Sequence, residues 1–304
     1  MKNKTRLFID GEAGTTGLKI HERLEKKTDI ELLKIAPELR KDASARAKML
    51  NAADYVFLCL PDDAAREAVA LIDNPSVKVI DASTAHRTNK NWAYGFPELS
   101  SEHEERIRDS KRVAVPGCYA SGFIALIYPL VLEGFLNADE AISCFGISGY
   151  SGAGKAFISE YESPERNPEL GSARLYALTQ SHKHQPEMQK ICGLKHQPMF
   201  NPIIDDYYSG LLLSVPLQPR SLKSKISVDE IKSLYKRRYT KGRVRYIDGD
   251  NITFLAANTL ADTDDMELYV FGNDERILLT ARFDNLGKGA SGAAVQCYEI
   301  MSNK

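Results

Sequence analysis

The chain has 304 residues, of which 43% are hydrophobic and 27% are charged. This length and composition suit a globular protein with two domains. Forty basic residues nearly cancel 41 acidic ones, so charge gives no reason to expect nucleic acid or an anionic membrane as partner. The five cysteines are widely spaced and form no C-x-x-C pair, which argues against a disulfide framework and a thiolate zinc site.

The N-terminal stretch MKNKTRLFIDGEAG leads into a strand and a glycine turn without the apolar core of a signal peptide. No apolar run reaches the length of a membrane-spanning helix, about 18 residues. We therefore expect a cytoplasmic protein that does not associate with membranes.

The first third of the chain alternates apolar strands with helix-like segments. We expect strands at residues 6–10, 30–36, 55–61, 77–83 and 112–116. Helices are expected at residues 16–27, 42–53 and 62–72, with Asp42 as an N-cap. This alternation is typical of a parallel sheet that is covered on both faces.

Three glycines follow the first strand and open the first helix, namely Gly11, Gly14 and Gly17. Their spacing is a variant of the dinucleotide fingerprint, in which glycine lets the backbone approach a pyrophosphate. Thr15 and Thr16 add hydroxyl groups there. A glycine turn without a ligand is the alternative, but its place after the first strand favours a dinucleotide site.

The segment after the second strand bears on the choice of cofactor. An acidic residue there would suit the ribose of NAD, whereas arginine suits the 2′-phosphate of NADP. Arg40 and Lys41 favour NADP(H), while Glu38 keeps NAD open. Both cations also suit a solvated loop.

Cys118 stands between a short strand and a long apolar helix in the stretch VAVPGCYASG. Pro116 and Gly117 end the strand, so the thiol is expected at the helix start. The amides and dipole of a helix start stabilise a thiolate, which makes Cys118 a candidate nucleophile. The alternative is a small buried cysteine, which suits Cys59 better.

The rest of the chain has strands with few helices between them, which indicates an antiparallel α+β domain. A strand is expected from 210 to 219, and a helix from Ser227 with Glu230 completing a capping box. Residues 268–285 resemble a hairpin turning at 272–275, and a final helix closes the chain.

A second glycine cluster fits a phosphate loop through Gly149, Gly154 and Lys155. The next residue is Ala156, so the hydroxyl that would hold magnesium is missing. We expect instead a backbone loop that binds an anion at a cleft.

The segment SHKHQPEM supplies a possible base for the thiol. His182 and His184 are followed by Glu187, and Pro186 indicates a turn into a helix. His184 and Glu187 would then share one helix face, where the carboxylate could orient the imidazole. No third ligand completes a metal site.

Eight motifs together resemble the N-acetyl-gamma-glutamyl-phosphate reductases of the shorter bacterial form. In chain order they are FIDGEAGTTGL, CLPDDAAREAV, DASTAHR, YGFPEL, VPGCYASG, SGYSGAGK, SHKHQPEM and DNLGKGASGAAVQ. The resemblance implies an α/β chain with a Rossmann-type parallel-sheet domain and an α+β catalytic domain of the semialdehyde dehydrogenase type. The expected domains are 1–117 for NADP, 118–285 for catalysis, and a helix at 286–304 that returns to the first domain.

The resemblance also implies an NADPH-dependent reduction of a small anionic acyl phosphate in arginine biosynthesis, by a homodimer or homotetramer. Cys118 matches the family's nucleophile, and His184 with Glu187 matches its acid/base segment, although His182 stays a candidate for that role. The expected cofactor residues are Gly11, Gly14, Thr15, Thr16, Gly17, Arg40, Ser83, Gly152 and Asn285. Arg87 and Ser121 are the expected substrate-binding residues.

Three other functions stay open at the level of the sequence. A reductase of the same fold could act on aspartyl phosphate or a carrier-bound aminoadipyl phosphate, because fold does not decide the substrate. A cofactor-free hydrolase could use Cys118 and His184 alone. A non-enzymatic NADP sensor would not need the thiol.

Overall fold

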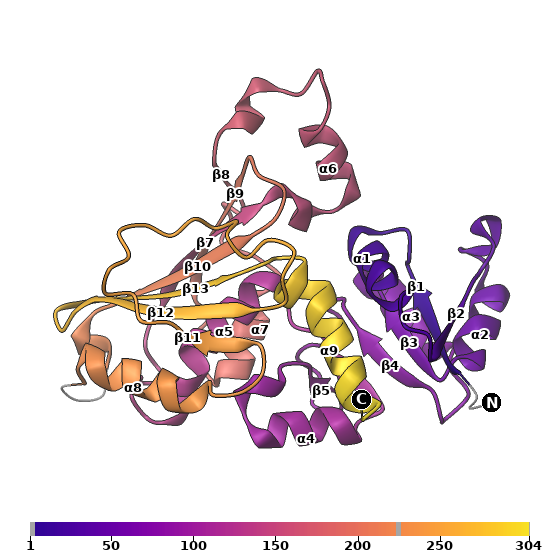
Figure 1. The fold of residues 1–304 in the computed structure, drawn as a ribbon, viewed down its shortest axis with the longest axis horizontal. Coiled ribbons are helices and arrows are strands. Elements are labelled where there is room, and N and C mark those ends of the chain that lie inside the picture. The colour runs from indigo at the N-terminus through magenta and orange to yellow at the C-terminus, as the bar shows by residue number, and fades with distance from the viewer. Residues whose placement is uncertain (1–3, 223–225, 304) are drawn as a thin grey trace. The chain divides into compact units, whose positions relative to one another are not determined.

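The computed structural model describes residues 4–222 and 226–303. The chain divides into two compact units, one formed by Met1–Pro116 with Ala290–Lys304 and the other by Gly117–Gly289. The final helix, α9 (Gly292–Met301), belongs to the first unit. Figure 1 follows the chain through both units.

The first unit is built on one parallel sheet. Its strands lie in the order β2 (Ile30–Leu33), β1 (Thr5–Asp10), β3 (Tyr55–Leu58), β4 (Lys78–Asp81), β6 (Arg112–Ala114) and β5 (Ala93–Tyr94). The chain forms β2 on one side of β1 and β3 on the other. The strand order therefore reverses between β1 and β3, where open α/β sheets bind ligands at the carboxyl ends of their strands.

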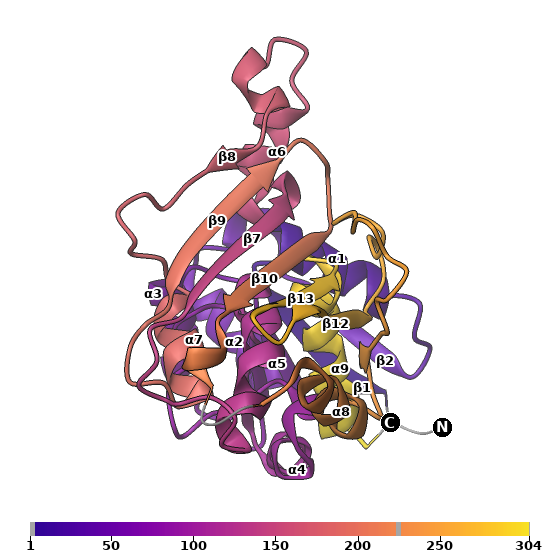
Figure 2. The ribbon, with the colours of Figure 1, turned by 90° about the vertical axis from the view of Figure 1, so that its left-hand side faces the viewer.

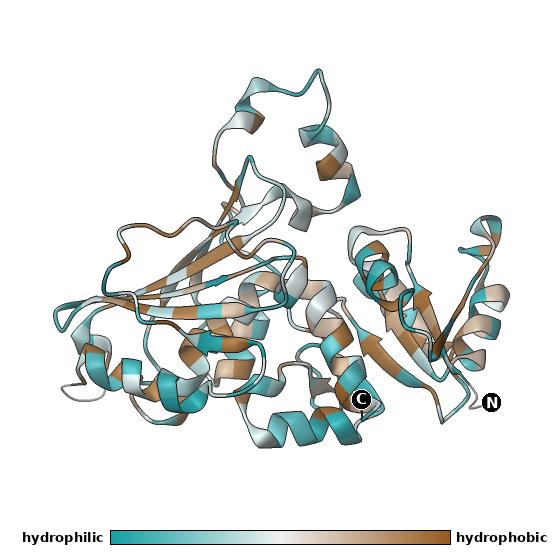
Figure 3. Ribbon diagram, in the orientation of Figure 1, coloured by the Kyte–Doolittle hydropathy of each residue, from teal (hydrophilic) through white to brown (hydrophobic). Residues whose placement is uncertain are grey.

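Helices cover both faces of this sheet. The helices α1 (Thr15–Leu24), α4 (Ser101–Asp109) and α9 contribute to the core on one face, and α2 (Ala43–Ala52) and α3 (Asp62–Ala70) to the core on the other. Along β1, Leu7 and Ile9 join the first core and Phe8 the second, as the alternation of a strand requires. The outward side of α4 is polar (Figure 3).

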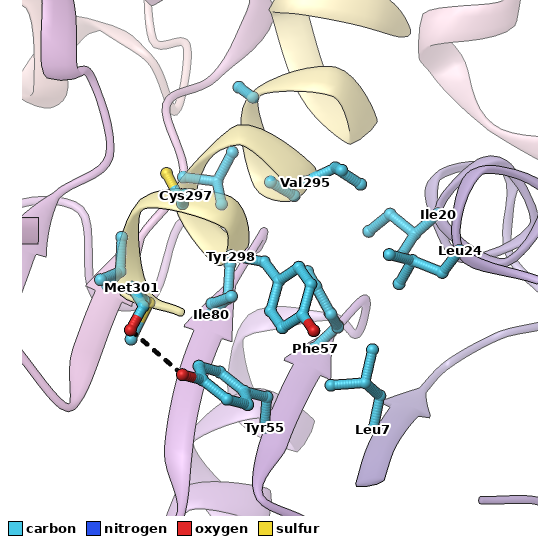
Figure 4. Packing of buried hydrophobic residues seen from close by; sticks show 14 of the residues in the cluster. Leu7, Ile20, Leu24, Tyr55, Phe57, Ile80, Val295, Cys297, Tyr298 and Met301 are labelled. Atoms are coloured by element: carbon cyan, nitrogen blue, oxygen red, sulfur yellow. Dashed lines mark hydrogen bonds between the residues drawn. The ribbon is translucent and has the colours of Figure 1, made fainter. Parts of the chain in front are cut away.

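The helix α9 is held on this sheet by aromatic packing. Tyr298 lies edge-on to Tyr55 with ring centroids 5.0 Å apart, and the Tyr55 hydroxyl donates to the Met301 carbonyl at 3.1 Å (Figure 4). The last turn of the helix is therefore tied to β3, far away in the sequence.

The predicted elements of the first unit are all present, and most of them end earlier than expected. The helix expected at 16–27 ends at Leu24, and the strand expected at 30–36 ends at Leu33. Asp42 is confirmed as the N-cap of α2, because its side chain accepts the N–H of Ala45.

The second unit holds a mixed sheet. Its strands lie in the order β11 (Val244–Tyr246), β12 (Met266–Asn273), β13 (Arg276–Phe283), β10 (Leu211–Leu217), β7 (Ser143–Gly149), β9 (Met199–Asp205) and β8 (Arg174–Leu175). The expectation of an antiparallel domain is wrong for two pairs, since β7 pairs with β9 and β11 with β12 in parallel. The long crossover from β7 to β9 carries α6 (Lys155–Tyr161) and α7 (Gln185–Cys192), and such a connection makes a parallel pair possible.

The apolar helix α5 (Cys118–Leu132) packs beside this sheet (Figure 2). A Cβ on Gly122 would lie only 2.9 Å from the Phe283 ring, so glycine permits the close approach. From α8 (Val228–Arg238) and the residue after it, the hydroxyls of Tyr235 and Tyr239 donate to α5 carbonyls at 2.6 and 2.7 Å.

Two local predictions for this unit are confirmed. Ser227 and Glu230 form the capping box of α8. The strands β12 and β13 form the hairpin, in which Asn273 pairs with Arg276 and Gly272 has a φ of +95°.

Candidate active site

Cys118 is the first residue of α5, as predicted, and its side chain is half-buried. Gly117 is the N-cap and has extended backbone angles, so the chain turns into the helix at the thiol. A side chain in this position lies beside the amides of the first turn, where the helix dipole stabilises negative charge. The location of Cys118 suits a thiolate nucleophile.

Three other cysteines suit a packing role. Burial raises the thiol pKa of Cys59, Cys144 and Cys192. Each therefore keeps its proton at neutral pH and is a poor nucleophile.

A carboxylate from a second helix fixes the residue before the thiol. Glu187 lies in the first turn of α7, and its Oε1 accepts the backbone N–H of Gly117 at 2.9 Å. Both residues are buried, and a charged acceptor strengthens such a bond. The sequence pattern suggests His184 as the partner of Glu187, and no local signal predicts this contact, which joins positions 70 residues apart.

His182 and His184 lie together at the start of α7, with ring centroids 4.7 Å apart. The Nδ1 of His182 accepts the backbone N–H of His184 at 3.1 Å, so the neutral His182 ring carries its proton on Nε2. Burial, with the charge of Lys183, lowers the pKa of His182 from 6.5 to about 4. His182 is therefore neutral at pH 7, and His184 is the buried N-cap of α7.

Tyr119 connects the thiol region with the histidines. Its ring centroid lies 6.2 Å from that of His182 and 6.1 Å from that of His184. The ring covers Gly146, where a Cβ would come within 2.5 Å of it. The hydroxyl donates to the Ile203 carbonyl at 3.2 Å, and burial raises its pKa well above the usual value. The start of α5 and the histidine segment therefore lie side by side in the second unit.

A π-helical turn, which the sequence did not reveal, brings Gly289 next to Cys118. It covers Gly287–Ser291, and the N–H of Gly289 donates to the Asp284 carbonyl at 2.9 Å. A Cβ on Gly289 would lie 3.0 Å from the Cβ of Cys118, so glycine allows the backbone to approach this residue closely. Such turns are frequent at functional sites.

Asn285 joins separate loops of the second unit and is buried. Its Oδ1 accepts the N–H of Gly210 at 2.8 Å, and its Nδ2 donates to the Ser151 hydroxyl at 3.0 Å. A Cβ on Gly152 would lie 3.2 Å from the same Nδ2. Two of the residues predicted for the cofactor, Asn285 and Gly152, therefore lie next to each other.

The second glycine cluster forms a short 3₁₀ turn, Tyr150–Ala153, before α6. Gly154 has a φ of +92°, and Lys155 begins the helix with an exposed side chain. The anion-binding role of this loop stays a prediction.

The two residues expected at the substrate bond to the backbone. In α5, the Ser121 hydroxyl donates to the Gly117 carbonyl at 3.0 Å. In the first unit, Arg87 donates from Nε to the Val115 carbonyl at 2.8 Å and from Nη2 to the Ala82 carbonyl at 2.9 Å. Their contacts with substrate stay predictions.

The glycine turn of the first unit has the geometry of a dinucleotide cradle. Gly11 has a φ of +88°, and a Cβ on it would lie 2.3 Å from the Cys59 carbonyl oxygen. A Cβ on Gly17 would lie 2.4 Å from the Gly11 carbonyl oxygen. Gly14 is the N-cap of α1, and the buried Thr15 Oγ1 has no hydrogen-bond partner in the described part of the chain. These features fit a pyrophosphate at the helix start.

Two arginines after β2 differ in their surroundings. Arg40 follows a 3₁₀ turn and is exposed, as are Glu38 and Lys41. Arg46, which sequence analysis missed, is buried and donates to the Asp10 carboxylate at 2.9 and 3.1 Å. Burial raises the pKa of Asp10, although Arg46 opposes the rise. Arg46 therefore fixes the end of β1, and Arg40 stays the candidate for a 2′-phosphate.

Within residues 4–222 and 226–303, no group of His, Cys, Asp or Glu side chains is arranged to hold a metal ion. No helix in the same residues is long and apolar enough to span a membrane.

Two family models match the chain. The semialdehyde dehydrogenase NAD binding domain matches residues 6–107, and the semialdehyde dehydrogenase dimerisation domain matches residues 118–285. The fold and site thus define a class, that of the two-domain semialdehyde dehydrogenases. The expected fold class is confirmed.

The chain is 46% identical over 303 residues to N-acetyl-gamma-glutamyl-phosphate reductase 2 of Pseudomonas putida, covering 97% of this chain and 96% of that one. It is 44% identical over 315 residues to the protein of the same name from Nostoc sp., covering 98% and 97%. The solved aspartate semialdehyde dehydrogenase with NADP from Candida albicans shares the fold, with a TM-score of 0.71, 15% identity and 98% of both chains covered. The chain belongs to the N-acetyl-gamma-glutamyl-phosphate reductases of the semialdehyde dehydrogenase family, as its motifs indicated.

Proposed function

We propose that this chain reduces N-acetyl-gamma-glutamyl phosphate to N-acetylglutamate semialdehyde and phosphate, with NADPH, in arginine biosynthesis. The observation that carries the proposal is the 46% identity to a reductase of that name over 97% of the chain. The placement of Cys118 at a helix start supports it independently.

In the proposed reaction, the Cys118 thiolate attacks the acyl carbon, and phosphate leaves with the electron pair of the broken bond. This forms a thioester on Cys118. The amides at the start of α5 stabilise the developing oxyanion. Bound NADPH supplies the hydride that reduces the thioester. Hydride addition leaves an alkoxide, which takes a proton from the acid/base group to form the thiohemiacetal. The same group takes this proton back as the C=O bond re-forms and the C–S bond breaks, which releases the aldehyde and the thiolate.

His184 is the proposed base, with the neutral His182 as its neighbour. The pKa of His182, lowered to about 4, leaves this ring a poor proton acceptor at neutral pH. Its Nε2–H is suited to donate a hydrogen bond. Glu187 supports the thiol through Gly117.

For the cofactor, we propose that the turn from Gly11 to Gly17, with the hydroxyls of Thr15 and Thr16, holds the pyrophosphate. Ser83, Gly152 and Asn285 complete the proposed set. Arg40 is proposed to bind the 2′-phosphate that distinguishes NADPH from NADH.

The cofactor proposal is tested with Arg40→Ala. We expect KM for NADPH to rise about tenfold, with KM for NADH unchanged, because the lost contact is a charge-assisted one. Arg66→Ala is the control, since Arg66 is an exposed arginine of α3 in the same unit. Equal effects of Arg40→Ala on both cofactors would remove Arg40 from the 2′-phosphate site.

The substrate proposal is tested by measuring NADP⁺ reduction with phosphate and each of three aldehydes. We expect N-acetylglutamate semialdehyde to be oxidised much faster than aspartate semialdehyde or aminoadipate semialdehyde. Preference for either of the latter would favour a related acyl-phosphate reductase. Enzyme-dependent release of phosphate from N-acetyl-gamma-glutamyl phosphate without any nicotinamide would favour the hydrolase.

A further inference from the structure

A buried carboxylate ends β4 in the first unit. Asp81 is 0% exposed, and its Oδ1 accepts the N–H of Ser83 at 2.9 Å. Its Oδ2 accepts the Ser83 hydroxyl at 2.7 Å and pairs with the His86 Nδ1 at 2.7 Å. Because a carboxylate only accepts, His86 is the donor and carries its proton on Nδ1. One carboxylate thus holds two positions of the loop that follows the strand.

The other side of the His86 ring is fixed by stacking. The ring lies parallel to Trp92, with centroids 4.0 Å apart and an interplanar angle of 10°. Both residues are buried. The imidazole therefore has one orientation, in which its Nδ1–H meets Asp81.

The loop at 82–87 lies at the ligand-binding edge of the sheet. The strand β4 pairs with β3 in parallel, so this loop and the one after β3 emerge at the same edge. The two are joined by the N–H of Thr84, which donates to the Asp62 carboxylate at 2.9 Å. The Cys59 carbonyl, directly after β3, touches the glycine turn at Gly11. The loop at 82–87 is thus connected with the proposed pyrophosphate cradle through the segment that follows β3.

We propose that His86 is a positioning residue for the dinucleotide. Through Asp81 it holds Ser83 and the loop at 82–87 in the shape that receives the cofactor. Without the imidazole donor, the buried Asp81 carboxylate loses one of its partners, and the loop rearranges to solvate it. The inference rests on the proposed function, which supplies the cofactor. It adds His86 as a residue that acts on cofactor binding without touching the cofactor.

Two substitutions separate the two contacts of His86. His86→Phe keeps a ring on Trp92 and removes the donor, whereas His86→Asn keeps a donor near the place of Nδ1 and removes the ring. We expect Kd for NADP⁺, measured by calorimetry, to rise about tenfold in His86→Phe and to stay within about threefold in His86→Asn. At saturating cofactor, kcat should change little in both.

His103→Phe is the matched control. His103 is a second histidine of the same unit, and its Nδ1 pairs with the Ser100 hydroxyl at 2.7 Å at the start of α4. We expect it to bind NADP⁺ as the unaltered chain does. Unchanged binding by His86→Phe, or equal losses in His86→Phe and His86→Asn, would overturn the inference.

A measurement on the unaltered chain keeps the test decisive if His86→Phe does not fold. Hydrogen exchange of the Ser83 and Ala85 amides, which bond to Asp81 and to the Ser83 hydroxyl, should slow when NADP⁺ binds. If bound NADP⁺ leaves this exchange unchanged, the inference is overturned while the proposed function still stands. Failure of the unaltered chain to bind NADP⁺ would overturn the proposed function with it.

Discussion

His182 couples the candidate site to pH through its lowered pKa. The folded chain binds a proton on this ring only near pH 4, whereas the unfolded chain does so near 6.5. The unfolded state therefore gains protons first as the pH falls. The contribution of this group to stability is present above pH 6.5 and is lost as the pH falls from 6.5 toward 4.

We predict that His182→Asn removes this acid-side loss. Between pH 7 and pH 5 the unfolding free energy of the unaltered chain should fall by about 1 kcal/mol more than that of the variant. This is about half of what the two pKa values alone would give, because water still reaches the ring and screens its charge. Urea unfolding at the two pH values measures the difference. His196→Asn, at an exposed histidine, is the control, and parallel pH dependences for the unaltered chain and His182→Asn would refute the prediction.

Single residues also show where the sequence was informative. Cys118 was predicted at a helix start because Pro116, Gly117 and the apolar run that follows are local signals. The bond from Gly117 to Glu187 was not predictable, since it depends on how two helices pack. The contacts of His86 were not predictable for the same reason, because Asp81 and Trp92 reach it only in the fold.

At the scale of elements, α7 sets the start of α5 through one carboxylate. Glu187→Gln keeps an acceptor for the Gly117 N–H but removes its charge, so the bond weakens and the thiol is held less firmly. We predict a fall in kcat of about tenfold, with a similar fall in the alkylation rate of Cys118.

The matched control is Glu230→Gln. Glu230 occupies the same position of α8 and accepts the N–H of Ser227 at 2.8 Å. This variant should lose a similar amount of stability and keep its kcat. A Glu187→Gln variant that is as active as Glu230→Gln would show that the junction of α7 and α5 does not position the thiol.

Elements defined by local signals were the ones predicted. The capping box of α8 and the hairpin of β12 and β13 each lie within a few residues of sequence. The π-turn at Gly287–Ser291 was taken for ordinary helix, because its wider hydrogen bond depends on packing and not on a residue pattern. The parallel pairing of β7 with β9 spans a long crossover, which strand patterns do not reveal.

At the scale of the whole molecule, one sheet face of the second unit is apolar and exposed. Phe145 of β7, Leu175 of β8 and Met199 of β9 are 38%, 51% and 61% exposed, and their strands are neighbours (Figure 2). The same residues fall within the match to the dimerisation domain. Exposed apolar patches of this kind mark interaction surfaces.

We predict that this face joins copies of the chain. The double substitution Phe145→Arg with Met199→Arg should convert a dimer or tetramer into smaller species in sedimentation analysis, because it places charge in an apolar contact. Phe254→Arg is the control, since Phe254 is 82% exposed in a loop of the same unit. An assembly that survives the double substitution would show that the copies meet elsewhere.

The central claim is that Cys118 carries the acyl group during the reaction. The most direct test measures both the reductase turnover and the Kd for NADP⁺ of the Cys118→Ala variant. We predict that turnover falls by at least about a thousandfold while Kd for NADP⁺ stays within about twofold, because Cys118 is not among the residues proposed to hold the cofactor. Turnover near that of the unaltered chain would contradict the thioester mechanism.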